Sequence, residues 1–518
     1  PPFRWRETSY YMGQLGVPGC IELRRAHKYP DNLQFLSMYG HSLYRFVPPD
    51  TYFESNPEYF SEINGQRVAP VGLNWEEIWT FLEDHPDKAG QLCMTNPEVA
   101  RIIAEGVKDE IATHPDWEMV NVSVMDWAGY CTCDNCRAVD EREGTPMGSF
   151  LTGLNRVAEQ VAAVYPEAKI QTFAYTHVQK PPKHLTPHPN IVVQFAPIGL
   201  DYSRVLGDPA APENVQGLAD LKRWGKIATH LQGWDYTPNF ENPNGPHPNF
   251  HVIQPNIALF AKHGVTELFI QGWAAGEAAF SEFQWLRTYV IDKALWDPRQ
   301  DGEKHVREFV ELYYGDAAPF ILEYIELMTK HVMQPDIRMG CFNDQSWLTY
   351  DVVTQAQALF AQAWAAVKDD ATIRDRVERA QVAVHYAALV CPPKTVYGDH
   401  SIELIRPPSI SLDDYIGLLR RFGAAGRKYE GYDPEGYIRK RCDGATPPRY
   451  EKLGLAVLEN EDTLIWVVPE HHGAIVRWHD KNTGIELFRG WGKDTGLRGS
   501  FEEWTISPGR GIGEGWVS

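Results

Sequence analysis

Short apolar runs alternate with amphipathic segments through roughly the first three hundred residues. The apolar runs have the length and the β-branched content of buried parallel strands. The eight runs predicted as strands are Phe3–Tyr10, Leu33–Tyr39, Gln91–Met94, Val120–Asp126, Lys169–Thr176, Ile191–Ala196, Ala228–Tyr236 and Glu267–Gly272. Between them lie segments with a 3.6-residue period, and one of these opens with a cap and a proline at Thr95-Asn96-Pro97. This alternation predicts an α/β fold, namely a closed (β/α)8 TIM barrel over residues 1–298.

The pattern changes twice after the barrel region. Residues 299–446 show amphipathic segments without a strand pattern, which predicts an α-helical domain. The expected helices are Val306–Tyr314, Phe320–Met333, Tyr350–Val367, Ile373–Leu389 and Leu412–Tyr429. Residues 447–518 begin with the Pro447-Pro448 linker, and their short apolar runs predict a small C-terminal β domain. The runs expected as strands are Leu464–Val468, Ala474–Trp478 and Glu486–Phe488.

Composition and charge narrow the classes of partner. The net charge of −20, from 49 basic and 69 acidic residues, argues against nucleic acid, because phosphate binding needs clustered lysines and arginines. No apolar run reaches the ~18 residues that a membrane span needs. The chain opens at Pro1 without a signal-like segment, so we expect the numbering to start inside a longer precursor. The sequence gives no indication of the oligomeric state.

Carboxylates lie where three of the predicted strands end, on the face where a barrel keeps its chemistry. Asp126 ends the fourth strand, Asp235 lies at the end of the seventh, and Glu277 follows the eighth. We take these three as candidate catalytic residues, because glycoside hydrolysis needs one carboxyl to protonate the leaving oxygen and another to activate water or attack. The plainer interpretation of Asp126 and Asp235 is a helix cap or an ion pair with Arg4 or Arg6.

Aromatic and basic residues at the same strand ends predict the substrate contacts. A flat ring offers a surface on which the C–H face of a sugar can stack, and arginine binds a carboxylate through two parallel hydrogen bonds. The candidates are His41, Arg45, Trp127, Tyr175, His177, Trp234, Tyr236 and Trp273, with Arg204 as a second arginine. The alternative for the tryptophans is packing in the core without a substrate contact. The alternative for His41 is a structural histidine. The predicted partner is a carbohydrate substrate.

Three thiols fall within six residues at Cys131, Cys133 and Cys136. Zinc or iron bound by thiolates favours four ligands, and Cys93, at the end of the neighbouring predicted strand, is placed to be the fourth. We expect a structural four-thiolate site with zinc, or with iron. A disulfide within the cluster and a catalytic metal with an open position are the alternatives. The remaining cysteines are expected to be buried free thiols: Cys20, Cys341, Cys391 and Cys442.

These features together resemble a known family. Residues from about Phe3 to Pro298 are similar to bacterial proteins of the DUF4838 family, which is grouped with the α-glucuronidase-like glycoside hydrolases of the TIM-barrel clan. The matching stretches are Gly40-His41, Leu92–Glu98, Asp126 with Tyr130–Cys136, Trp234–Tyr236, Pro246–Asn249 and Leu295–Pro298. The resemblance implies a barrel followed by helices, action on a terminal sugar with uronic acids among the candidates, and a periplasmic or extracellular location. This sequence departs from the xylan-acting glucuronidases in one respect: those enzymes use a glutamate as acid, whereas here the fourth predicted strand ends in Asp126.

A second resemblance covers the tail. Leu458–Leu487 is similar to the opening of a galactose-mutarotase-like β-supersandwich, which normally needs far more residues than follow, so we expect a truncated domain. The main hypothesis is a glycoside hydrolase of polysaccharides or oligosaccharides in which Asp126 and Asp235, with Glu277 in reserve, flank the bond. The alternatives are a metal-dependent sugar oxidoreductase or isomerase that uses the cysteine-bound ion, and a carbohydrate-binding protein without activity.

Overall fold

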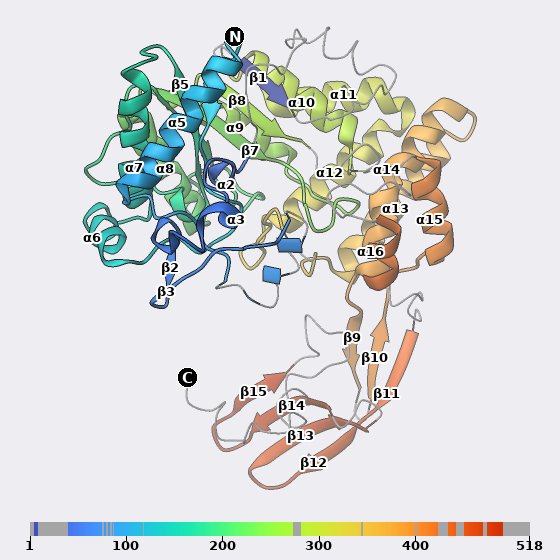
Figure 1. Ribbon diagram of the computed structural model, residues 1–518. Helices are drawn as coiled ribbons and strands as arrows, with labels where there is room; N and C mark the ends of the chain where they lie inside the picture. The colour runs from blue at the N-terminus through green and yellow to red at the C-terminus, as the bar shows by residue number, and fades with distance from the viewer. Residues whose placement is uncertain are drawn as a thin grey trace.

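The computed structural model describes most of the chain (Figure 1). The described residues are 5–8, 40–74, 77–78, 81–82, 85, 88–117, 119–272, 281–342, 345–398, 401–422, 434–441, 450–469 and 474–489. Of the eight predicted strands, Leu33–Tyr39 lies outside these ranges.

Six parallel strands form one curled sheet in the order β1-β8-β7-β6-β5-β4. The strands are β1 (Trp5–Thr8), β4 (Met119–Asn121), β5 (Lys169–Tyr175), β6 (Ile191–Ala196), β7 (His230–Tyr236) and β8 (Glu267–Gln271). They confirm six of the predicted strands, although β4 is shorter than expected. The described residues therefore form a mixed α/β fold whose parallel sheet makes up part of a barrel.

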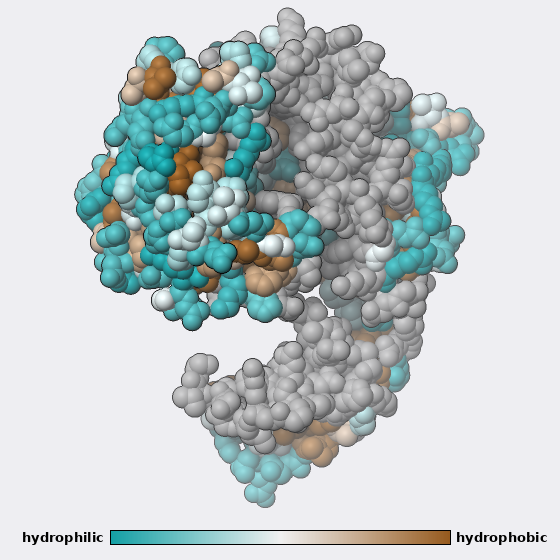
Figure 2. Space-filling model, in the orientation of Figure 1, coloured by the Kyte–Doolittle hydropathy of each residue, from teal (hydrophilic) through white to brown (hydrophobic). Residues whose placement is uncertain are grey.

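Helices connect these strands and cover the outside of the sheet (Figure 1). They are α2 (Leu43–Phe46), α3 (Pro49–Tyr52), α5 (Pro97–Thr113), α6 (Asp134–Glu143), α7 (Met147–Ala162), α8 (Pro212–Ile227), α9 (Phe250–Lys262) and α10 (Gln284–Trp296). As predicted, α5 begins with a cap: the Asn96 side chain accepts a hydrogen bond from the Glu98 N–H, and Pro97 fills the first turn. The surface over α5, α6 and α7 is mostly hydrophilic (Figure 2), as expected for amphipathic helices with one solvent-facing side.

A row of hydrogen-bonded side chains, which we call the amide ladder, crosses the inner face of the sheet with one member from each of five strands. Gln171 of β5 accepts from Asn121 of β4 (3.0 Å) and donates to Gln194 of β6 (3.4 Å) and Gln232 of β7 (2.5 Å). Gln232 donates in turn to Glu267 of β8. All five side chains are buried, so the ladder supplies the partners that these polar groups need.

The predicted strand Gln91–Met94 does not join the sheet, and this prediction is wrong. The segment makes a single antiparallel bridge, between Leu92 and Phe60. The side chain of Gln91 takes the place of strand pairing: its Oε1 accepts from the Met125 N–H (2.8 Å), and its Nε2 donates to the Trp127 carbonyl (2.7 Å). Because the Gln91 side chain already binds the Met125 N–H and the Trp127 carbonyl, these backbone groups are not available to pair with a strand.

Hydrogen bonds to other parts of the chain explain why β4 ends early. Beyond Asn121, the Val122 N–H still donates to the Gln171 carbonyl of β5 (2.8 Å). On the other side, the N–H groups of Ser42 and Leu43 both donate to the Ser123 carbonyl (3.2 and 3.3 Å). On the side away from β5, the run to Asp126 is therefore bound by the residues that begin α2 and by the Gln91 side chain, and not by a described strand.

The helices that follow the barrel region pack in two hydrophobic clusters. They are α11 (Gly302–Tyr314), α12 (Ala318–Val332), α13 (Tyr350–Ala366), α14 (Ala371–Val390), α15 (Leu412–Arg421) and α16 (Pro434–Arg441). Of these, α11 to α14 share the hydrophobic core of the barrel region, and α15 and α16 pack in a second cluster against α14. The first cluster of buried side chains extends continuously from the sheet to α14. None of the described helices has both the length and the apolar character that crossing a bilayer requires.

The expectation that residues 299–446 contain no strand is wrong. After α14, β9 (Lys394–Tyr397) and β10 (Ser401–Ile405) form an antiparallel pair, and β11 (Tyr450–Gly454) pairs with the other edge of β10. The two strands have four and five residues, too few for a clear period among helical segments. This small sheet leads to the C-terminal strands (Figure 1).

The C-terminal strands form an antiparallel meander. They are β12 (Ala456–Glu459), β13 (Thr463–Val468), β14 (Ala474–Asp480) and β15 (Ile485–Arg489). Of these, β13, β14 and β15 confirm the three predicted strands, and β12 was not predicted. Register shifts interrupt the β13–β14 and β14–β15 pairs, and such bulges increase the local twist of a two-stranded ribbon.

A buried ion pair ties the loop after β6 to the helical region. Arg204 Nη1 lies 3.0 Å from Asp201 Oδ2, and both side chains are almost fully buried. Arg204 Nη2 donates to the carbonyls of Met333 (3.0 Å) and Gln334 (2.9 Å), just beyond α12. Arg204 is thus committed to holding two parts of the fold together.

Replacing Arg204 is expected to destabilise the protein strongly. Arg204→Met would leave the Asp201 carboxylate buried without its principal cation, which typically costs ~3–5 kcal/mol. The exposed pair of Arg299 with Asp297 offers a matched control, because solvent screens this interaction and Arg299→Met should change stability little. Urea unfolding followed by circular dichroism measures both. Equal midpoints for the two variants would contradict the structural role of Arg204.

Candidate functional site

Asp126 lies at the C-terminal end of the sheet with its carboxyl group half-buried. Its Oδ1 is 3.4 Å from His41 Nε2, and its side chain is 31% exposed. The Tyr175 hydroxyl, at the end of β5, also hydrogen-bonds to this carboxyl group. Burial raises the pKa of Asp126, while His41 and Tyr175 oppose that shift. The result is a carboxyl group that solvent can reach and that keeps its proton to higher pH than a surface aspartate.

The imidazole of His41 is oriented by the backbone. Its Nδ1 lies 2.5 Å from the Val124 carbonyl, and a carbonyl oxygen can only accept, so Nδ1 carries the hydrogen. In the neutral ring Nε2 is then an acceptor, and it faces Asp126 Oδ1, which in the carboxylate is an acceptor too. The contact is favourable only when one proton lies between the two groups. His41 and Asp126 therefore form a proton-sharing pair.

Aromatic rings line the inner face of the sheet beside this pair. His41 packs against the edge of Phe173 (ring centroids 5.6 Å apart), and Phe173 packs against Trp234 (5.7 Å). Trp234 stacks on Tyr236 at 5.7 Å, and its Nε1 donates to Gln271 Oε1 (3.1 Å). The structure thus brings together candidates from β5, β7 and the segment before α2 on one aromatic wall.

Asp235 does not belong to this wall. Neighbouring residues in a strand point to opposite faces, and Trp234 and Tyr236 both point inward. Asp235 is paired in register with Ile270, which is fully buried. On the same face, a Cβ added to Gly233 would meet the Phe260 ring of α9, which identifies the helix side of the sheet.

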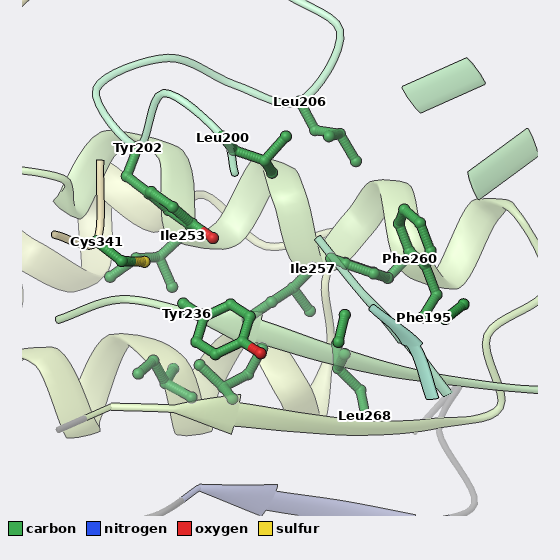
Figure 3. Close-up of a cluster of buried hydrophobic side chains, with 14 of the residues drawn as sticks. Phe195, Leu200, Tyr202, Leu206, Tyr236, Ile253, Ile257, Phe260, Leu268 and Cys341 are labelled. Carbon is green, nitrogen blue, oxygen red and sulfur yellow. The ribbon is translucent and has the colours of Figure 1, made fainter. Parts of the chain in front are cut away.

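The surroundings of Asp235 are apolar. It is 3% exposed, and its nearest electrostatic neighbours include Tyr202 and Cys341. Figure 3 shows these two side chains next to each other beside Ile253 of α9. Burial raises the pKa of Asp235 to about 7, opposed by the hydrogen bond that its carboxyl group accepts from the Tyr236 N–H (2.9 Å). Asp235 therefore lies on the helix side of the sheet, whereas Asp126 lies beside His41, which packs on the inner-face ring of Phe173.

The remaining candidates have different environments. Arg45 is exposed and pairs with Glu110 of α5 at 2.6 Å, away from the aromatic wall. Trp127 is buried and donates from Nε1 to the Gly90 carbonyl (2.9 Å), so it packs in the loop next to Asp126. Trp273 and Glu277 lie outside the described residues.

The structure also pairs His177 with a residue that the sequence reasoning did not select. The Tyr130 ring stacks on the His177 ring with centroids 5.6 Å apart and planes inclined by 20°. Tyr130 is 40% exposed, and burial lowers the pKa of His177 to about 4. Its position in the sequence could have identified Tyr130, because it stands directly before the cysteine cluster and four residues after Asp126.

The four cysteines of the predicted metal site come together in a buried cluster. The Sγ atoms of Cys93, Cys131, Cys133 and Cys136 all lie within 4.8 Å of one another, and Cys93 is 3.7 Å from Cys133 and 3.8 Å from Cys136. A tetrahedral ion with metal–sulfur distances of ~2.3 Å places its sulfurs about 3.8 Å apart. All four are free thiols, so the cluster contains no disulfide. The donor set and spacing suit a metal ion with four protein ligands.

Neighbouring groups complete the environment of this cluster. The hairpin of β2 (Glu62–Ile63) and β3 (Gln66–Arg67) packs on it. The Glu62 N–H and Arg67 Nη1 donate to Cys131 Sγ (3.3 and 3.5 Å), and Thr95 Oγ1 lies 3.1 Å from Cys136 Sγ. Such hydrogen bonds and the arginine charge offset the negative charge of four thiolates around a divalent ion. Cys341 and Cys391 are separate buried thiols, as expected, and Cys20 and Cys442 lie outside the described residues.

Comparison with known proteins gives one family. The family model described as "Domain of unknown function (DUF4838)" matches residues 1–326. No curated protein matches the sequence. Among solved structures, one described as a GH138 enzyme targeting pectin rhamnogalacturonan II is similar with a TM-score of 0.35 and 12% identity. That similarity covers 59% of this chain and 43% of the other, so the chain spans less than half of that protein.

The cysteine cluster is expected to bind one divalent metal ion per chain. Protein expressed with added zinc should retain about one equivalent, and cobalt exchange should produce the visible absorption of a tetrahedral cobalt thiolate. Cys136→Ser removes a buried ligand and should abolish both signals. Cys391→Ser, outside the cluster, is the control and should preserve them. A wild-type chain that takes up neither ion would refute the metal site.

The buried carboxyl group of Asp235 predicts a pH dependence of stability. Its pKa is about 7 in the folded protein and roughly 3.9 when unfolded, so the folded state binds the proton more tightly. The resulting stability is complete below pH ~4 and is lost as the pH rises through ~7.

Unfolding in urea at pH 4.5 and pH 8 tests this dependence. Between these values, wild type should lose on the order of a few kcal/mol relative to Asp235→Asn, which cannot ionise. The surface variant Asp116→Asn should keep the wild-type dependence. Parallel curves for wild type and Asp235→Asn would contradict the buried, protonated carboxyl group.

Proposed function

The chain belongs to the DUF4838 family, a domain family of unknown function, and from the geometry around Asp126 we propose that it is a glycoside hydrolase. The observation that carries this proposal is the half-buried carboxyl group of Asp126, paired with His41 at 3.4 Å beside a wall of aromatic rings. Hydrolysis of a glycoside needs such a protonated group within reach of the leaving oxygen. The aromatic wall would hold the C–H face of a terminal sugar.

In this proposal Asp126 is the general acid. It transfers its proton to the glycosidic oxygen as the bond from that oxygen to the anomeric carbon breaks, and water supplies the hydroxyl group to that carbon. The second proton of the water restores Asp126, directly or through the partner carboxylate. His41 Nε2 faces the carboxyl group at 3.4 Å and helps to position it for the proton transfer. Tyr175, whose ring lies 5.9 Å from that of His41, also helps to orient the carboxyl group through its hydroxyl.

The partner carboxylate in this proposal is Glu277. Asp235 faces the helix layer, so the sequence leaves Glu277, which follows β8, as the remaining candidate. The proposal also adds Leu33–Tyr39 to the six described strands as a seventh strand of the barrel. This is supported by the position of His41, since the residues that directly follow that segment meet the sheet at its C-terminal end.

The substrate proposed is a terminal neutral sugar of an oligosaccharide or polysaccharide. Both arginines that the sequence offers for a uronate carboxylate are engaged elsewhere, Arg45 with Glu110 and Arg204 with Asp201. A terminal uronic acid, as the family resemblance suggests, is the competing substrate and belongs in the same test.

A metal-dependent reaction at the cysteines is less well supported. The cluster offers four thiolates and is buried, whereas a catalytic site keeps a coordination position open for water or substrate. We therefore propose zinc in a structural role, which pins the loop between Asp126 and Cys131.

Turnover of a defined substrate panel tests the proposal. The panel consists of 4-nitrophenyl α- and β-glycosides of glucose, galactose, xylose, rhamnose and glucuronic acid, with the matching disaccharides. Asp126→Asn keeps the shape of the side chain but removes the acid, and should lower kcat/KM on disaccharides by ~100-fold or more. Asp235→Asn is the matched control and should stay within about threefold of wild type.

Two results would overturn the assignment. Binding of sugars without turnover by wild type across the whole panel would favour a carbohydrate-binding protein. Near wild-type turnover by Asp126→Asn would show that the acid lies elsewhere.

A further inference from the structure

The stacked rings of Tyr130 and His177 belong to the two segments that carry Asp126 and Tyr175. Tyr130 lies in the loop that follows Asp126, and His177 follows Tyr175, whose hydroxyl group bonds to the Asp126 carboxyl group. The two loops extend from β4 and β5, which are neighbours in the sheet. Both rings therefore lie at the C-terminal end of the sheet, near the proton-sharing pair.

The backbone on both sides of Tyr130 is fixed. Gly129, directly before it, has a positive φ of 89°, accepts a hydrogen bond from the Gln91 N–H (3.0 Å), and lies so near the Ala89 carbonyl that a Cβ would be 2.3 Å from the oxygen. Cys131, directly after it, belongs to the cysteine cluster. A large aromatic side chain is thus held on a rigid turn with 40% of its surface exposed. A ring ordered in advance loses little entropy when a ligand packs on it.

The stack is also electrically neutral. Burial lowers the pKa of His177 to about 4, so the imidazole carries no charge at neutral pH. The Tyr130–His177 pair then offers a flat, uncharged surface with polar atoms at its edges. A sugar unit without charge has the matching chemistry, with an apolar C–H face and hydroxyl groups around its rim.

Depth distinguishes this surface from the aromatic wall. Trp234 is half-buried inside the sheet, whereas Tyr130 is exposed at the rim. A terminal sugar enters deepest, and the glycosidic oxygen must lie at Asp126, so the next unit of the substrate is left outside. We propose that Tyr130, stacked on His177, is the binding subsite for the neutral sugar unit that leaves when the bond is cut. This inference rests on the proposed function and assigns the second half of the substrate site.

Kinetics with two kinds of substrate test the subsite. Wild type, Tyr130→Ala and Tyr130→Phe are compared on the disaccharide that the panel identifies and on the glycosyl fluoride of the same terminal sugar, which has no leaving sugar. Tyr130→Ala should raise KM for the disaccharide about tenfold and leave KM for the fluoride within twofold. Tyr130→Phe retains the ring and should behave as wild type. The metal content of both variants shows whether the neighbouring cluster is intact.

Calorimetry separates this inference from the proposed function. The disaccharide should bind to Asp126→Asn, and the added Tyr130→Ala change should weaken that binding about tenfold. Absence of any turnover by wild type overturns the proposed function itself. Turnover in which Tyr130→Ala, with its metal retained, changes neither substrate or both equally overturns the subsite alone.

Discussion

The amide ladder is the constraint on which the candidate site depends. Each of its members is buried and bonds to a member on another strand, so a slip of one residue in any strand would turn a polar side chain toward the apolar helix layer. A buried amide without a partner costs about 1–3 kcal/mol, and one slip would break the bonds of two neighbours. The ladder therefore fixes the facing of every residue further along the strands. It points Trp234 and Tyr236 into the barrel and Asp235 out of it.

A second constraint acts on the part of the site that no strand carries. Asp126 and Tyr130 stand in an irregular loop, and such loops are usually poor supports for chemistry that needs a fixed geometry. Here the Gln91 side chain binds one half of the loop and the cysteine cluster holds the other. The site thus joins two devices: a polar network that orients the strands, and a sulfur cluster that anchors the loop.

Most of the elements could be predicted from the sequence, because six parallel strands and the helices after them follow apolar periodicity and capping residues. The position of Cys93 beside the other thiols was predicted from a strand at Gln91–Met94 that does not form. The structure still brings all four thiols together, because the Gln91 side chain binds this segment to Met125 and Trp127. The side of the sheet to which Asp235 points could not be predicted. At a strand end, the register of the strand decides whether Trp234 or Asp235 points into the barrel. The signal lay lower in the strands: Gln194 and Gln232 interrupt apolar runs at paired positions, and Gln171 interrupts β5 on the same face of the sheet.

Other features of the fold could not be predicted from local sequence patterns. The strand expected at Gln91–Met94 is replaced by one side chain that imitates a peptide, which no periodicity can reveal. The strands β9 and β10 are stabilised by β11, which comes about fifty residues later, so their own sequence carries little of the information.

The pairing of β1 with β8 has a consequence for biosynthesis. Trp5 pairs with Glu267, so this parallel pair cannot form until roughly 260 further residues have left the ribosome. At ~5–20 residues per second their synthesis takes more than ten seconds. Among the described strands of the sheet, β4 to β7 can therefore pair with one another before β8 exists, and β1 joins β8 last.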